Sequence, residues 1–289
     1  MTLNIPQPRL VDHEALSLHR ARARWSMRLR EADFIHRNAA DEIEERLRDV
    51  NRTFTAPAIV TAHPEIWADA VPGAVCVPPG EVLDLRPGAH DLVVHAMALH
   101  WADDPVGQIV QCRRALVADG LFLAAGFGGE TLNELRTALA EAEIAETGGL
   151  SPRVAPMAEV RQMGALLQRA GLALPVADAL RMTASYGDIF ALMRDLRAMG
   201  ETNALVDRHK TPARRSLFAR AAAIYQDRFA DDEGRIRATF EVIFLTGWAP
   251  HESQQKPLRP GSAQTRLAEA LNATHVQDNP VTALDRADD

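Results

Sequence analysis

Residues 91–129, DLVVHAMALHWADDPVGQIVQCRRALVADGLFLAAGFGG, decide the fold of this chain. Apolar runs at 91–97 and 121–127 flank a segment, 105–116, whose apolar residues recur at roughly helical spacing. This succession predicts a βαβ unit with two parallel, buried strands. The Asp-Gly pair at 119–120 supplies a turn signal before the second strand.

The carboxyl ends of these two strands are the place to look for a site, because ligands of parallel sheets bind there. His100 and Trp101 directly follow the first strand. His100 is a candidate acid, base or hydrogen-bond donor and Trp101 a candidate stacking surface; the alternative is a capping histidine and a packing aromatic. Gly128 and Gly129 follow the second strand, where they either let the backbone approach a ligand or only turn the chain.

The same stretch, with TLNELR at 131–136, resembles the fourth strand, following helix and fifth strand of class I S-adenosylmethionine (SAM) methyltransferases. Its LHW and FGG phrases are similar to one branch, the complex I assembly factor 5 proteins, or arginine hydroxylases, with their bacterial relatives. The malonyl carrier-protein methyltransferases are more distantly similar. The resemblance covers about residues 11–267 and continues through GGLSPRVAP at 148–156, LMRDLRAMGETNA at 192–204 and GWAPHESQQKPLRPGSA at 247–263.

The resemblance implies an α/β, Rossmann-like methyltransferase fold with an abridged N-terminal half and a helical cap inserted near the C-terminus. It implies N-terminal helices in residues 1–55 and a methyltransferase-like domain in 56–271. Within that domain, residues 187–235 are expected to form the cap over the strand ends. The polar, acidic residues 272–289 are expected to be a disordered tail.

The composition excludes several classes of protein. A net charge of −7 argues against bulk nucleic-acid binding. Cys76 and Cys112 are too few for a disulfide framework, and no leader or membrane-spanning run is found, so a cytoplasmic protein is expected. The basic run at 20–30 is interpreted as a solvated helix face; the alternative is a docking surface for an acidic partner or a lipid headgroup, which leaves peripheral membrane contact open.

The expected cofactor turn departs from the family pattern. A SAM-binding domain needs a glycine-rich turn after its first strand, here residues 56–61, but Ala62 and His63 occupy that turn. Relatives end the second strand, here 75–77, with an acid, whereas Pro78 and Pro79 follow here. We therefore predict weak SAM binding or none. If SAM does bind, the resemblance assigns it to Ala62, His63, Ala96, Met97 and Trp101.

The phrase VLDL at 82–85 mimics the strand that opens a glycine-rich motif. The next strand begins almost at once, near residue 91, and a βαβ crossover needs about a dozen residues or more. We predict a linker at 82–85 and no cofactor strand.

Further polar residues are candidates for binding. Asp103 and Asp104 precede Pro105 and are predicted to cap the following helix. Glu201 and Asn203, between two expected cap helices, could bind a guanidinium or an amide or could form a surface turn. A metal is not expected, since His90, His95 and His100 alternate faces along a strand.

Two functions remain open. In the first, the resemblance implies methylation or hydroxylation of a protein arginine during respiratory complex I assembly, with His100 and Glu201 as the catalytic pair. Gly128, Gly129 and Asn203 would then contact the substrate. In the second, the chain is a non-catalytic assembly chaperone that has lost SAM binding. For either, His100–Trp101 and 201–203 are predicted to face one cleft.

Overall fold

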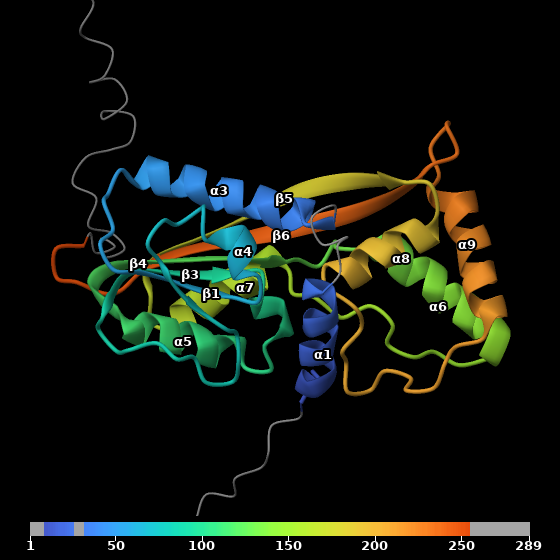
Figure 1. Ribbon diagram of the computed structural model, residues 1–289, viewed down its shortest axis with the longest axis horizontal. Helices are drawn as coiled ribbons and strands as arrows, with labels where there is room; N and C mark the ends of the chain where they lie inside the picture. The colour runs from blue at the N-terminus through green and yellow to red at the C-terminus, as the bar shows by residue number, and fades with distance from the viewer. Residues whose placement is uncertain (1–8, 26–31, 255–289) are drawn as a thin grey trace, which may run out of the picture. The chain divides into compact units, whose positions relative to one another are not determined.

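A six-stranded sheet forms the centre of the protein in the computed structural model, which describes residues 9–25 and 32–254 (Figure 1). The strand order is β2-β1-β3-β4-β6-β5. The first four strands in this order run parallel, and β6 runs antiparallel to both of its neighbours. This topology confirms the α/β, Rossmann-like class I methyltransferase fold. The strands are β1 (Pro57–Thr61), β2 (Val75–Val77), β3 (His90–Ala96), β4 (Leu116–Phe127), β5 (Ala173–Tyr186) and β6 (Ile236–Trp248).

Alternation along the central strands builds two core clusters. In β1, Ile59 belongs to the larger cluster, whereas Ala58 and Val60 belong to the smaller one, because successive side chains point to opposite faces. The smaller cluster includes α5 (Pro105–Ala115) and α7 (Val160–Arg169). The larger cluster includes α3 (Phe34–Val50), α4 (Pro64–Trp67), α6 (Asn133–Thr147), α8 (Ile189–Ala198) and α9 (Arg215–Phe229).

The remaining helix, α1 (His13–Arg24), is held by a third, small cluster. Leu16 of α1 packs there together with Trp101 and Leu205. Asp103 accepts hydrogen bonds from the backbone nitrogens of Leu10 and Val11, just before the helix. These contacts fix α1 against the carboxyl ends of the parallel strands.

The predicted βαβ unit is present as β3, α5 and β4, with one correction. Asp119 and Gly120 do not precede β4 but lie inside it, and Asp119 has a left-handed φ of 61°. Leu116 already pairs with His90, and the register then shifts so that Leu121 pairs with Leu92. The turn signal is therefore absorbed as an irregularity in the strand.

Other local predictions can be compared directly. Residues 82–85 form no helix or strand, which confirms that they are a linker. The strand β5 is continuous, with a register shift near its start. Asp104 caps α5 by accepting from the Gly107 nitrogen, as predicted, but Asp103 does not, because it binds the residues before α1.

Chain contacts separate residues 1–251 from 252–289, and only 252–254 of the second unit are described. The predicted tail at 272–289, and Arg28 and Arg30 of the basic run, lie outside the described residues. The boundaries at 55 and 271 and the cap at 187–235 stay predictions. In the described part, no helix is both long enough and apolar enough to cross a membrane.

Candidate functional site

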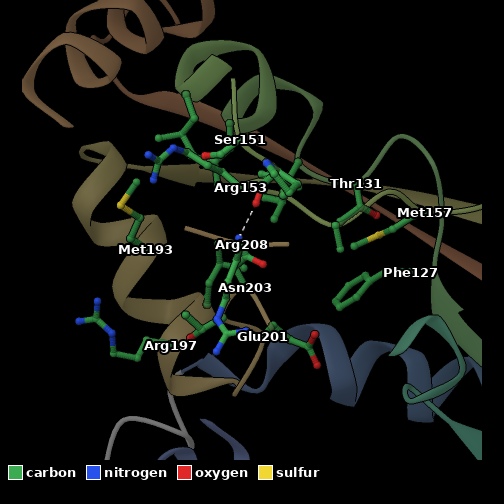
Figure 2. A pocket seen from close by; sticks show the side chains of 18 of the residues that line it. Phe127, Thr131, Ser151, Arg153, Met157, Met193, Arg197, Glu201, Asn203 and Arg208 are labelled. Carbon is green, nitrogen blue, oxygen red and sulfur yellow. Dashed lines mark hydrogen bonds between the residues drawn. The ribbon is translucent and has the colours of Figure 1, made fainter. Parts of the chain in front are cut away.

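A cavity of about 320 Å³, here called the cap cavity, lies between α6, α8 and the loop at 151–157 (Figure 2). Its wall is mostly apolar and aromatic, with polar groups concentrated where the segment after α8 closes it. The wall includes Trp101, Phe127, Arg153, Arg197, Glu201, Asn203, Arg208 and Phe240.

Glu201 is the one acidic side chain among the residues of this wall that the structure describes. Its side chain is 5% exposed. One oxygen, Oε2, accepts a hydrogen bond from Trp101 Nε1 at 2.6 Å and lies 3.2 Å from His100 Nε2. The other oxygen, Oε1, makes no hydrogen bond to a residue that the structure describes.

The environment keeps Glu201 ionised. Burial raises the pKa of Glu201, but interactions with His100 and Arg20 outweigh burial and hold that pKa at about 2. The cap cavity therefore contains a fixed negative charge with one oxygen left for a ligand.

The arginines of the cap cavity differ in how far they are neutralised. Arg153 pairs with Glu143 at 2.6 Å, and Arg208 pairs with Asp12 at 2.8 Å. Arg197 is exposed and has no ion pair with a described residue. In Figure 2, Arg197 and Met193 lie on the side of the cavity opposite Phe127. Because Arg153 and Arg208 are paired and Arg197 is exposed, Glu201 and the aromatic rings are the groups that a ligand inside the cavity would meet.

A second cavity, of about 460 Å³, lies where β1 and β2 end and is here called the strand-end cavity. This is where a cofactor sits in doubly wound folds. Its wall combines the ends of these two strands with α1 and contains Arg9, His13, Leu16, Ser17, Arg20, Arg24, Thr61, Ala62, Pro64, Cys76, Val77, Pro78, Pro79, Gly80 and Glu81.

Several buried polar side chains beside these cavities lack partners. Arg20 Nε and Nη2, both ring nitrogens of His36 and one ring nitrogen each of His63, His95 and His100 have no hydrogen-bond partner in the described part of the chain. The His36 and His63 rings lie 4.8 Å apart. Burial lowers the pKa of His36 to about 3 and that of His95 to about 4, so both are neutral near pH 7.

The sequence of the chain is similar to those of several named proteins. The arginine hydroxylase NDUFAF5 of Dictyostelium discoideum, named as mitochondrial, is 42% identical over 180 residues, 62% of this chain and 41% of that protein. Its counterpart in Danio rerio is 34% identical over 209 residues, 72% of this chain and 65% of that protein. The chain is similar to the NDUFAF5 arginine hydroxylases. This finding confirms the resemblance drawn from the sequence.

The chain also has more distant similarities. A malonyl-[acyl-carrier protein] O-methyltransferase from Laribacter hongkongensis is 36% identical over 181 residues, 63% of this chain and 58% of that protein. A solved SAM-dependent methyltransferase from Thermotoga maritima is 10% identical, with a TM-score of 0.41 over 78% of this chain and 97% of that chain. No protein-family model matches. The chain spans 41% to 65% of the length of the two NDUFAF5 proteins above.

The residues of the strand-end cavity do not fit the SAM of such methyltransferases. Ala62 carries a Cβ atom in the wall after β1, where the family places glycine. Pro78 and Pro79 take the place of the acid that ends the second strand in relatives, and Glu81, the carboxylate in the described wall, is exposed. The guanidinium groups of Arg20 and Arg24 line the wall and would repel the sulfonium cation.

The residues predicted to bind SAM and those predicted to bind the substrate do not all line one cavity. Trp101 and Asn203 line the cap cavity with Glu201, as the predicted common cleft requires, whereas His100 lies outside the wall and contacts Glu201 Oε2 at 3.2 Å. Ala62 lines the strand-end cavity instead. His63, Ala96 and Met97, which were also expected to contact SAM, line neither cavity, so the expected cofactor residues do not share one cavity.

Other predicted site residues are buried outside both cavities or hold the cap cavity wall together. His63 is 2% exposed and packs against His36, and neither cavity wall includes it. Ala96 and Met97 are each 1% exposed and lie outside both walls. The Asn203 amide donates to Pro152 O and accepts from Leu205 N, so it ties the cavity wall together.

Gly128 and Gly129 are also outside both walls. A Cβ atom on Gly128 would collide with Glu241 and Ile243 of β6, which explains that glycine by packing. The three histidines near β3 bind separately, His90 to Ala56 O, His95 to Gln108 and His100 to Glu201. Residues 9–25 and 32–254 contain no group of three or more His, Cys, Asp or Glu placed to hold a metal ion.

The sequence reasoning missed Arg153, Arg208 and Phe240 of the cap cavity. Their spacing along the chain gives no signal, because the wall assembles from segments that meet only in the fold. Arg20 was noticed only as part of a basic run; its spacing from Arg24 places both on one face of the helix but does not show that this face lines a cavity.

Proposed function

We propose that this chain is a methyltransferase-like protein that binds an arginine side chain of a protein client in the cap cavity and thereby assists respiratory complex I assembly. The observation that carries the proposal is Glu201, an ionised carboxylate held in place by Trp101, with Oε1 free of hydrogen bonds to described residues. The similarity to proteins named as arginine hydroxylases supports arginine as the side chain.

The chemistry of the cavity suits a guanidinium. A guanidinium donates hydrogen bonds in a planar fork to carboxylates and also stacks on aromatic rings. Glu201 supplies the carboxylate, and Trp101, Phe127 and Phe240 supply aromatic surface in the same wall. An ammonium group would gain the charge interaction but lose the planar contact.

Methyl transfer from SAM is the less favoured activity. The strand-end cavity has Cβ atoms, prolines and arginines where SAM needs glycine and a carboxylate. Client binding by Glu201 requires none of these features. We therefore propose client recognition as the function, with the buried His100 serving to hold the Glu201 carboxylate rather than to react.

The test is a titration of purified full-length protein with arginine-containing peptides tiled over complex I subunits. The best binder is then remade with lysine or citrulline in place of arginine. We expect the citrulline peptide to bind the parent protein about 10- to 100-fold more weakly than the arginine peptide does. The Glu201→Gln variant should bind the arginine peptide more weakly by a similar factor, because each change removes a charge-assisted hydrogen bond. Glu44→Gln, an exposed change of equal charge on α3, is the control and should bind normally.

Three results would overturn the proposal. One is the absence of any arginine-dependent binder in the peptide set. Another is equal affinity for the arginine and citrulline peptides. The third is normal binding by a folded Glu201→Gln variant, which would show that the carboxylate does not contact the client.

A further inference from the structure

The strand-end cavity has an excess of positive charge. Arg9 and Arg24 are exposed in its wall, and Arg20 extends into it from the buried side of α1. His13 also lines the cavity but is held by Asp103 at 2.7 Å. Among the described residues of the wall, Glu81 is the one carboxylate, and it is exposed. Because fixed guanidinium groups outnumber carboxylates, the cavity attracts anions.

Arg20 gives the second, independent observation. Its Nε and Nη2 atoms are buried and have no hydrogen-bond partner among the described residues. A Cβ atom on Gly200 would lie only 3.3 Å from the Cα and the Cγ of Arg20, so α1 packs closely against Gly200 at this residue. A buried donor without an acceptor is costly, and an oxyanion accepting in fork geometry would relieve that cost.

The remaining wall is apolar. Leu16, Ala62, Pro64, Val77 and the two prolines after β2 offer surface for an organic group. With about 460 Å³ the cavity has room for more than a free ion. A phosphate group matches several guanidinium groups better than a single carboxylate does, since it carries more charge and more acceptor oxygens.

We propose that the strand-end cavity binds a small organic phosphate in the position that SAM occupies in methyltransferases, with the phosphate against Arg20 and Arg24 and the organic part against the proline wall. The two cavities have separate walls, although Arg20 also interacts electrostatically with Glu201 of the cap cavity, and the proposal does not depend on the function proposed for that cavity.

The experiment is calorimetric titration of the full-length protein with ADP as the probe, beside inorganic phosphate, succinate and SAM. ADP should bind more tightly than inorganic phosphate and succinate, and SAM should bind at least tenfold more weakly than ADP. Arg24→Gln should weaken ADP binding about tenfold. Arg22→Gln is the matched control, because Arg22 is exposed on the same helix but lies outside the cavity wall.

Arg20→Gln tests the buried group, provided that its circular dichroism and melting temperature match those of the parent protein. If it does not fold, the comparison of Arg24 with Arg22 still decides the question. Vesicles of phosphatidylcholine with phosphatidylglycerol distinguish a lipid headgroup as the source of phosphate. The proposal is overturned if ADP does not bind, if SAM binds more tightly than ADP, if both single-arginine variants lose the same affinity, or if only the vesicles bind.

Discussion

Trp101 both lines the cap cavity and holds the charged side chain of Glu201. Its ring is 4% exposed and its Nε1 donates to Glu201 at 2.6 Å. We predict that Trp101→Ala weakens client binding by about 1–3 kcal/mol, the loss expected for a buried contact at the centre of an interface. Trp101→Phe should lose less, since it keeps the ring and removes only the hydrogen bond.

The measurement is the peptide titration described above, with circular dichroism to show that each variant is folded. Unchanged affinity in a folded Trp101→Ala protein would remove the cap cavity from consideration as the client site. The basic face of α1 would then be the next surface to test.

The glycine pair after β4 gives a second prediction for single residues. A Cβ atom on Gly128 would overlap Glu241 and Ile243, whereas one on Gly129 would be 3.6 Å from its nearest neighbours, an ordinary contact. We expect Gly128→Ala to lower the free energy of unfolding by about 1–3 kcal/mol, as overpacking does, and Gly129→Ala to change it little. Urea denaturation of the two variants checks this; equal stabilities would contradict the packing explanation.

The loop at 151–157 depends on an ion pair with α6. Glu143 accepts from Ser151 and pairs with Arg153 at 2.6 Å. Burial raises the pKa of Glu143, but the Arg153 and Ser151 hydrogen bonds outweigh it and hold that pKa at about 2. The loop carries Arg153 and Ala155 into the cap cavity, so this pair holds part of the cavity wall in place.

A pH dependence follows from the lowered pKa of Glu143. Stability from this pair is fully present above the ordinary glutamate pKa of 4.5 and is lost as pH falls toward about 2. We predict that Glu143→Gln costs on the order of 3 kcal/mol at pH 7 and progressively less between pH 4.5 and pH 2.5. Denaturant unfolding at a series of pH values measures the difference from the parent, with Glu44→Gln as the exposed control. A difference that stayed constant with pH would contradict the assignment.

At the level of elements, the sequence predicts most where local pattern and burial agree. β3 and β4 are buried apolar runs with α5 between them, and both could be placed from residues 91–127. The Asp-Gly pair was misplaced because strand pairing of Leu116 with His90 outweighs a local turn signal. Such pairing depends on a partner strand and cannot be read from nearby residues.

For the molecule as a whole, the expected response to SAM is a small one. If SAM binds with a dissociation constant of about 1 mM or weaker, 1 mM SAM adds only about 0.4 kcal/mol or less to the stability of the protein. We therefore predict a rise in melting temperature of about 1 °C or less. A dissociation constant near 1 μM would add about 4 kcal/mol and shift the transition by many degrees, which would contradict this prediction and favour a methyltransferase function.

The candidate site illustrates what the sequence does not contain. Glu201 and Trp101 could be named because both follow regular elements near the predicted strand ends. The separation into two cavities could not, since it depends on α1 crossing the strand ends and on Arg20 pointing inward. Helical periodicity predicts which face of α1 is polar but not which distant segment that face meets.

The way α1 is tied down sets an order of events during folding. Arg208 binds Asp12 across 196 residues of chain, and Asp103 binds Leu10 across 93. Contacts this far apart in sequence are slow to form, because a long loop must close before any of them is gained. The sheet also contains a distant pairing, Leu121 with Trp248, but α1 needs both the segment after β3 and the segment after α8 to be in place, so we expect α1 to dock late. Both cavities have α1, or residues it holds in place, in their walls, so binding competence should be recovered in a slow refolding phase that follows the return of most secondary structure.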